Sequence, residues 1–346
     1  MNPSTAHHDS RWPHRVAVMV VCAAFPLIWV GGLVTSTGAG MAVPDWPNTF
    51  GYNLFAYPLS TWVAGPWDLF IEHGHRLFAA AVGLLTIGLA AVLWLREERR
   101  WVQWLGVAAV ALVIAQGVLG GLRVVLSEVQ LAKIHGCVGP LFFAVTVALA
   151  VVTSRFWRTS APQAKTKQFP GSLARHGWFV CGVIYLQIVA GAHVRHVSPL
   201  AGPDSFRIAI VFHLILALLV VLSLGSLMIS VARHARGQGR LVRPAWLLLA
   251  LVAGQLVLGG GSWVVKYGWP EFAVQALGLT DSVWAAGWTN TVRDFSSSVI
   301  VTAHVATGSL MLVLAVMIAL RASRLAGQTK PHTATRAFHV MPLGMA

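Results

Sequence analysis

The sequence has few charged residues. Only 10% of its 346 residues are Asp, Glu, Lys or Arg, whereas 56% are hydrophobic. A soluble globular domain carries about 25% charged residues. This composition excludes an ordinary soluble domain and predicts an integral membrane protein.

Acidic residues are scarcer than basic ones: 11 Asp and Glu stand against 25 Lys and Arg, a formal net charge of +14. A nucleic-acid-binding protein would gather its basic residues on one soluble face. Here they fall between long apolar stretches instead. The basic excess therefore bears on membrane topology, and we expect no nucleic-acid partner.

Cysteine is also scarce. Cys22, Cys137 and Cys181 each lie inside an apolar run, and no CxxC spacing occurs. Neither a disulfide framework nor a cysteine metal site is expected. No short hydrophobic region with a small-residue cleavage site precedes the first apolar run, so we expect that run to remain as a membrane span.

Eight apolar stretches are long enough to cross a bilayer, which takes about 20 residues per helix. Lipid offers no partner for unpaired backbone groups, so the spans should be helices. An even number of spans places both termini on one side. The stretches are 16–37, 75–95, 104–125, 134–153, 176–197, 208–231, 245–266 and 297–320.

The basic residues are distributed unequally between the two sides of this topology. The side with the termini holds 18 of the 25 basic residues but only three acids, Asp9, Glu97 and Glu98. By the positive-inside rule that side is cytoplasmic, which predicts a multi-pass protein of the cell (inner) membrane. The opposite side carries two long aromatic segments, Thr35 to Glu72 and Tyr267 to Ser296, which could form an interfacial belt or a lid over a site.

An internal repeat divides the chain. Gln116 to Gly121 (QGVLGG) recurs as Gln255 to Gly260 (QLVLGG), 139 residues later, and His75 matches His213 at an offset of 138. We expect two tandem four-helix bundles that form a parallel repeat, since each has an even number of spans. The expected division is 1–15 cytoplasmic tail, 16–153 first half, 154–175 basic linker, 176–320 second half and 321–346 cytoplasmic tail.

Four histidines share one pattern. His75, His135, His213 and His304 lie near the start of the even-numbered spans, and each has a small residue four positions later. Residues i and i+4 share a helix face, so a flat macrocycle could lie there. Two histidines per half suit a bis-coordinated haem in a helical bundle. The alternatives are close helix packing by the small residues, or a zinc or copper site.

The two halves differ at one carboxylate. Glu72 lies one helical turn before His75, whereas alanine, isoleucine or valine stands at that spacing before the other three histidines. This predicts chemistry in the first half and a permanent redox group in the second. Glu72 could instead cap the helix or pair with Arg76, which is itself a candidate partner for haem propionates. His73, His193 and His196 lie nearby, and their role is left open between proton transfer and none.

The stretch GGLVTSTGAGMAVPDWP (31–47), followed by EHGHR (72–76), resembles the haem A synthase family, and the histidines and QxVLGG repeats agree. The resemblance covers about residues 15 to 320. It implies oxidation of a haem O methyl group to a formyl group through successive hydroxylation, with Glu72 essential. It further implies His75 and His135 at the substrate haem, and His213 and His304 as ligands of haem b. Many bacterial members carry an outer-loop cysteine pair, which this chain lacks between Thr35 and Glu72.

Two other classes use similar residues: a di-haem b electron-transfer protein, and a haem carrier or assembly factor. The expected partners of a synthase are haem O, the lipid bilayer and an electron donor or acceptor that the sequence does not name. Haem O synthase and cytochrome oxidase assembly proteins are further candidates.

Overall fold

The computed structural model describes residues 11–159, 170–269 and 294–327. Most of the predicted tails, part of the 154–175 linker and most of the second long segment lie outside these ranges. The described chain is all-helical apart from turns and one isolated bridge between Thr49 and Tyr52. The elements are α1 (Trp12–Ser36), α2 (Leu59–Val63), α3 (Trp67–Arg96), α4 (Arg100–Val125), α5 (Val129–Thr153), α6 (Arg155–Thr159), α7 (Gly171–Arg195), η1 (Pro199–Ala201), α8 (Gly202–His234), α9 (Gly239–Tyr267) and α11 (Phe295–Gly327).

Eight of these helices are long and apolar enough to cross a membrane, which confirms the predicted all-α membrane fold for the described residues. The helices extend beyond the apolar stretches because polar flanking residues continue the backbone hydrogen bonding. The largest difference is α3, which begins at Trp67 instead of residue 75. Glu72 and His73 are therefore helical residues, and His75 lies about two turns inside the helix.

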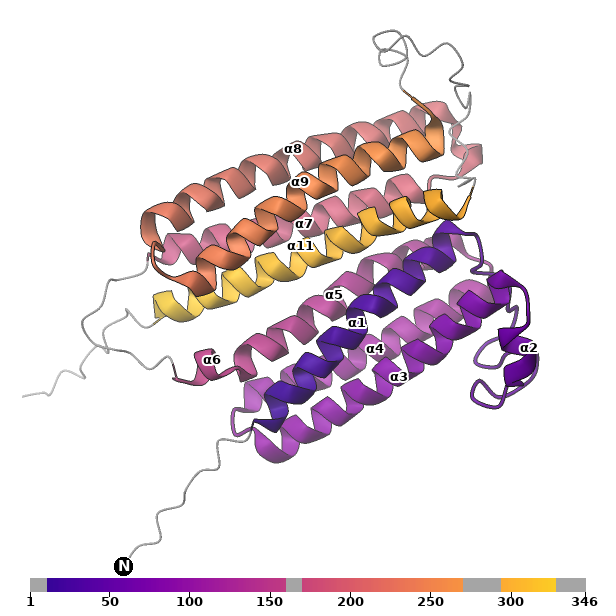
Figure 1. Cartoon of the computed structure of the whole chain (residues 1–346), viewed down its shortest axis with the longest axis horizontal. Coiled ribbons are helices and arrows are strands. Elements are labelled where there is room, and N and C mark those ends of the chain that lie inside the picture. The colour runs from indigo at the N-terminus through magenta and orange to yellow at the C-terminus, as the bar shows by residue number, and fades with distance from the viewer. Residues whose placement is uncertain (1–10, 160–169, 270–293, 328–346) are drawn as a thin grey trace, which may run out of the picture.

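The long helices pack as two groups (Figure 1). In the N-terminal group, α1 and α4 each contact both α3 and α5. In the C-terminal group, α7 and α9 each contact both α8 and α11. The order of packing is thus the same in both groups, as a parallel repeat predicts. The groups meet where α11 packs against α1 and α5, and where α5 contacts α7.

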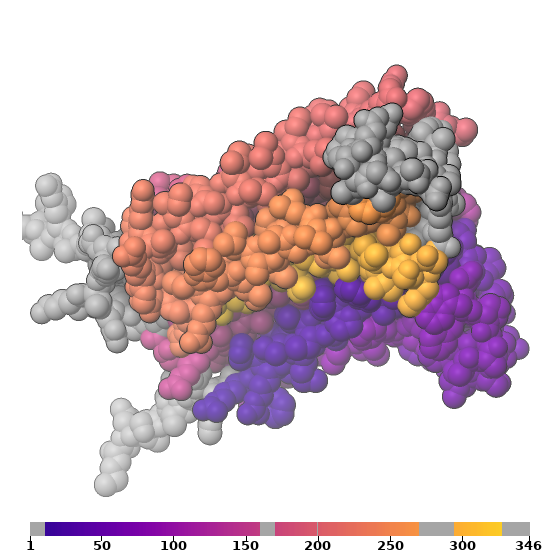
Figure 2. Space-filling view, turned by 45° about the horizontal axis from the view of Figure 1, so that its top comes forward, coloured from indigo at the N-terminus to yellow at the C-terminus, as the bar shows by residue number. Residues whose placement is uncertain are grey.

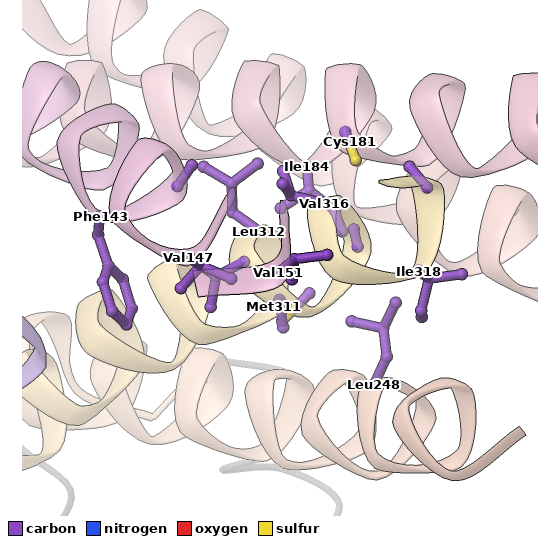
Figure 3. Packing of buried hydrophobic residues seen from close by; sticks show 14 of the residues in the cluster. Phe143, Val147, Val151, Cys181, Ile184, Leu248, Met311, Leu312, Val316 and Ile318 are labelled. Carbon is purple, nitrogen blue, oxygen red and sulfur yellow. The ribbon is translucent and has the colours of Figure 1, made fainter. Parts of the chain in front are cut away.

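The buried core follows this junction. Phe143, Val147 and Val151 of α5 lie among Ile184 of α7 and a row of α11 side chains (Figure 3). α5 and α11 are the most buried of the long helices. In the most apolar 18-residue stretch of each, 50% and 56% of the residues, respectively, are buried. Helices in lipid associate through close packing and hydrogen bonds. The two central helices therefore hold the groups together.

We call the end of the bundle that carries residues 37–66 the loop end, and the opposite end the basic end. At the basic end, Glu97 accepts two hydrogen bonds of 2.8 Å from Arg99 and one of 3.2 Å from Arg158 on α6. Arg99 also donates to the carbonyl oxygen of Val152 at 3.0 Å. Burial acts to raise the pKa of Glu97, but the hydrogen bonds and charge of Arg99 outweigh it and hold that pKa below its ordinary value. This network ties α3, α4, α5 and α6 together.

Candidate functional site

The four patterned histidines occur one each on α3, α5, α8 and α11, all of which run from the loop end to the basic end. They lie about two to three turns inside their helices, and each is half-buried. The structure thus places one pair in each helix group, toward the loop end. The pairs are His75 with His135, and His213 with His304.

The rings of His213 and His304 face one another across the C-terminal group. Their ring centres are 6.4 Å apart, with an interplanar angle of 67°. A bond from a metal to an imidazole nitrogen is roughly 2.0 Å, so two imidazoles that share a metal have ring centres on the order of 6 Å apart. The observed separation suits a single metal atom between the two rings.

His75 and His135 are also neighbours, close enough for an electrostatic interaction. The Nδ1 atom of His135 lies 3.1 Å from the backbone carbonyl oxygen of Gln116, which can accept its proton. That hydrogen bond would leave Nε2 of His135 as the nitrogen with a free lone pair. A second partner on the other ring nitrogen is the usual way in which proteins orient a ligating histidine.

Each of the four rings lies against a glycine on an adjacent helix. A Cβ atom at Gly31 of α1 would come within 2.9 Å of the His75 ring, and one at Gly120 of α4 within 3.2 Å of the His135 ring. The matching distances are 3.1 Å from Gly191 of α7 to His213 and 3.2 Å from Gly259 of α9 to His304. These glycines admit the rings to positions that any larger residue would obstruct. We call them the glycine seats.

The two QxVLGG motifs perform the same task in both groups. Gln116 donates from Nε2 to the backbone carbonyl oxygen of His135 at 3.1 Å, and Gln255 donates to that of His304 at 2.9 Å. The small residues Gly139 and Gly308 make room for these glutamines: their Cβ positions lie 3.0 and 3.5 Å from the amide nitrogens. At these two i+4 positions a glutamine amide is the nearest neighbour, and the expectation of space for a macrocycle stays a prediction.

Among the four patterned histidines, three buried ring nitrogens have no hydrogen-bond partner within the described chain. They are the Nδ1 atoms of His75, His213 and His304. The Nε2 atom of His213 lies 3.2 Å from Nε2 of Gln187, so a metal bound to that nitrogen would displace the glutamine. Buried polar atoms are rarely left unpaired, and such orphans point to a missing ligand or ion.

These features fit two haems, each held by a pair of imidazoles. The glycine seats, the 6.4 Å ring separation and the unpartnered ring nitrogens all suit that group. Among residues 11–159, 170–269 and 294–327, no three His, Cys, Asp or Glu side chains come together as a metal cluster. A zinc or copper site built from all four histidines is thus not formed.

Glu72 is buried beside the first pair, with 3% of its surface exposed. Its Oε1 atom accepts a hydrogen bond of 2.9 Å from Arg76, and its Oε2 atom accepts one of 2.9 Å from the backbone N–H of Val43. The helix N-cap is Pro66, six residues earlier. Of the structural alternatives for Glu72, pairing with Arg76 is therefore present and capping is not.

Arg76 uses its guanidinium to hold the segment 37–66. It donates to the backbone carbonyl oxygens of Asp45 at 2.7 Å, Val43 at 2.8 Å and Asn48 at 3.1 Å, in addition to Glu72. Both Nη atoms are thereby occupied. The expectation that Arg76 pairs with haem propionates gains no support from this arrangement.

The segment 37–66 also reaches α4. The ring of Trp46, from the PDWP sequence, lies where a side chain on Gly121 would be, 2.1 Å from that Cβ position. Arg123, two residues further along α4, donates to the carbonyl oxygen of Gly40. At the matching position of the second motif, a Cβ atom on Gly260 would meet nothing within 4 Å in the described chain. The first histidine pair is thus covered by a chain segment that the described C-terminal group lacks.

The three remaining histidines of the loop end have other partners. His73 is buried between Tyr57 and Trp62 and lies 3.0 Å from Oγ1 of Thr49. His193 lies 3.2 Å from Nζ of Lys133. His196 is hydrogen-bonded to the Ala192 carbonyl oxygen, and burial lowers its pKa to about 4, so that it is neutral near pH 7.

Sequence reasoning missed the glycine seats and the function of the glutamines. A signal was present, because glycine destabilises a helix interior and its recurrence in two QxVLGG copies implies close approach of another group. It also missed Gln187 and the contacts of Arg195, which no repeat marks. Arg207 forms an exposed ion pair with Asp204 at 3.2 Å.

Comparison with known proteins adds independent findings. Residues 66–274 match a family model described as "Cytochrome oxidase assembly protein". The chain is 33% identical over 267 residues to a protein named heme A synthase from Shouchella clausii, which covers 71% of this chain and 84% of that relative. A heme A synthase from Alkalihalophilus pseudofirmus is 27% identical over 246 residues, covering 66% of this chain and 80% of the relative. A protoheme IX farnesyltransferase from Halobacterium salinarum is 30% identical over 139 residues, 39% of this chain but only 28% of that protein.

Proposed function

Because this chain belongs to the haem A synthase family, membrane-bound haem-dependent oxidoreductases that convert haem O to haem A, we propose how its residues divide that work. Membership decides among the three classes that the sequence left open in favour of the enzyme. The proposal concerns which histidine pair serves the substrate and which serves a resident cofactor. It rests on one observation: within the described chain, the buried carboxylate of Glu72 and a covering segment adjoin the first pair, and neither has a counterpart at the second.

We assign His75 and His135 to the iron of the substrate, haem O. The methyl group to be oxidised would lie near Glu72, whose carboxylate is oriented by Arg76 and the Val43 amide. A fixed negative charge stabilises positive charge that develops at a reacting carbon. Each carboxylate oxygen still has a lone pair beyond its one hydrogen bond, so removal of a proton from water is the second role open to Glu72.

We assign His213 and His304 to a resident haem b, which would supply one-electron redox chemistry beside the substrate site. The 6.4 Å separation of the two rings supports this. The chain's own part is to hold both imidazoles in place through Gly191, Gly259 and Gln255. No carboxylate lies one turn before either histidine, as befits a group that carries electrons without being modified.

Arg76 is proposed as the residue that fastens the segment 37–66 over the substrate and fixes Glu72. Its four hydrogen bonds support this. Trp46 then covers α4 beside the His135 seat, since its ring lies on Gly121, next to Gly120. The segment would exclude water while leaving the lipid side open for the farnesyl tail of haem O.

For the membrane, we propose the cell membrane, with both termini and the basic end in the cytoplasm. We also propose the division at residues 153 and 176; the packing of the helices in two groups supports a division between α5 and α7, although α7 begins earlier, at Gly171. An electron donor or acceptor and cytochrome oxidase assembly proteins are further proposed partners. Haem O synthase is another, because one relative is named as a protoheme IX farnesyltransferase and matches this chain over only 28% of its length.

The assignment of the pairs is tested by purifying the double variants His75→Ala/His135→Ala and His213→Ala/His304→Ala from cells that supply haem O. The extracted haems are then separated by chromatography and identified by their molecular mass. The first variant should keep haem b and lose haem O and haem A. The second should lose haem b. Equal loss of haem b from both variants would overturn the division of labour and favour symmetric occupancy.

A further inference from the structure

Arg195 joins the two helix groups at the loop end. It is the last residue of α7, and its Nη2 atom donates to the carbonyl oxygen of Gly32 at 3.1 Å and to Oγ of Ser36 at 2.7 Å, both on α1. Gly32 follows Gly31, the seat of His75, and Arg195 lies one turn after Gly191, the seat of His213. Arg195 thus belongs to α7, whose Gly191 contacts His213, and its guanidinium contacts α1, whose Gly31 contacts His75.

The same junction reaches His304. The Oγ atom of Ser36 lies 3.0 Å from Oγ1 of Thr302 on α11, and Thr302 is two residues before His304. The methyl group of Thr302 would be 2.8 Å from a Cβ atom on Gly32. Arg195 itself is close enough to His304 to interact with it electrostatically. α1, α7 and α11 therefore meet at this point without room for a larger side chain.

The hydrogen bonds of Arg195 within the described chain go to neutral acceptors, a carbonyl and a hydroxyl, and to no carboxylate. By contrast, Arg76 and Arg99 are each paired with a glutamate. A charged group inside a transmembrane bundle is expensive and by default has a functional role. The positive charge of Arg195 is therefore left to act on whatever occupies the sites on either side.

We propose that Arg195, through its positive charge, sets the reduction potential of the haem held by His213 and His304. This inference rests on the proposed haem b site. Reduction of a ferric haem adds one negative charge, so a nearby cation stabilises the reduced form and raises the potential. Charge, burial and hydrogen bonding around a haem are established means of adjusting its potential.

The test is a redox titration of the bound haem in purified protein, followed by its optical spectrum. Arg195→Gln removes the charge and should lower the midpoint potential, whereas Arg195→Lys keeps the charge and should stay near the wild-type value. Ser36→Asp keeps Arg195 but sets a carboxylate against it, and should lower the potential even if Arg195→Gln does not fold. Two controls should leave it unchanged: Thr302→Val, which breaks the junction hydrogen bond without altering charge, and Arg207→Gln, which removes an exposed arginine of the loop end already paired with Asp204.

Wild-type potentials in both Arg195→Gln and Ser36→Asp, with haem bound, would overturn the inference. An Arg195→Lys potential as low as that of Arg195→Gln would also overturn it, because the effect would then depend on geometry and not on charge. Failure of the proposed site looks different: the wild-type spectrum would survive His213→Ala/His304→Ala. That outcome would remove the haem b site and this inference together.

Discussion

At the scale of residues, both helix groups contain the same arrangement of histidine, glycine and glutamine, and the first group has additional residues beside it. Each ligand histidine has a glycine seat, and each QxVLGG motif provides a glutamine that holds the backbone of the next histidine helix. Within the described chain, Glu72, Arg76 and Trp46 have no counterpart beside the second copy. On the proposed function, the shared residues would hold the haems and the unshared residues would serve oxidation of the substrate.

The two glycines of QLVLGG offer a matched pair of substitutions. Gly259→Ala would press a methyl group within 3.2 Å of the His304 ring, whereas Gly260→Ala meets nothing within 4 Å in the described chain. Overpacking of this kind costs about 1–3 kcal/mol, so Gly259→Ala should weaken haem retention roughly tenfold or more. The haem-to-protein ratio after purification measures this. Equal ratios for the two variants would contradict the seat.

The corresponding glycine of the first motif should behave differently. A methyl group on Gly121 would collide with the ring of Trp46, so Gly121→Ala must displace the segment 37–66 from α4. Formation of haem A should fall by about tenfold or more, while haem b content stays at the wild-type level. Gly260→Ala, at the same motif position in the C-terminal group, serves as the control. Full activity in Gly121→Ala would show that this cover is not needed.

At the scale of elements, the sequence was sufficient for the eight spans but not for their ends. Apolar length predicts a membrane helix, because the bilayer fixes that length. It could not show that α3 begins at Trp67, since residues 67–74 include Asp68, Glu72 and His73 and their helical state depends on contacts with the segment 37–66. The four ligand candidates were found because their spacing repeats. The glycine seats were not predicted, because each contacts a histidine on another helix and spacing along one helix does not show that contact.

The turn between α3 and α4 gives a pH-dependent prediction. The pKa of Glu97 is lowered in the folded protein, so its contribution to stability is present above its ordinary pKa of 4.5 and is lost as the pH falls through the lowered value. Glu97→Gln should reduce the free energy of unfolding by about 1–3 kcal/mol at pH 7. The difference between variant and wild type should shrink below about pH 4. Thermal unfolding in detergent at several pH values measures it, and a constant difference across that range would argue against the network.

At the scale of the whole molecule, the two helix groups meet through α1 and α5 of the first group and α7 and α11 of the second. The loop end of α11 lies against the first group (Figure 2). Trp67 of α3 contacts Phe295 of α11 edge to face, with ring centres 5.6 Å apart.

The basic residues at the basic end predict that this end and both termini face the cytoplasm. A fluorescent protein fused to residue 346 should fold and fluoresce inside intact cells, and external protease should leave the fusion intact. Cleavage of the tail by external protease would show that the C-terminus faces outward and would contradict the predicted orientation.

The central claim is that the two histidine pairs are similar in binding but unequal in chemistry, and Glu72 tests it most directly. The measurement is the haem A to haem O ratio extracted from cells that express the chain with a haem O source, for wild type and Glu72→Gln. The account predicts that Glu72→Gln lowers haem A formation by roughly 10²- to 10³-fold while the protein still purifies with haem b. Haem A formation at the wild-type level in Glu72→Gln would contradict it.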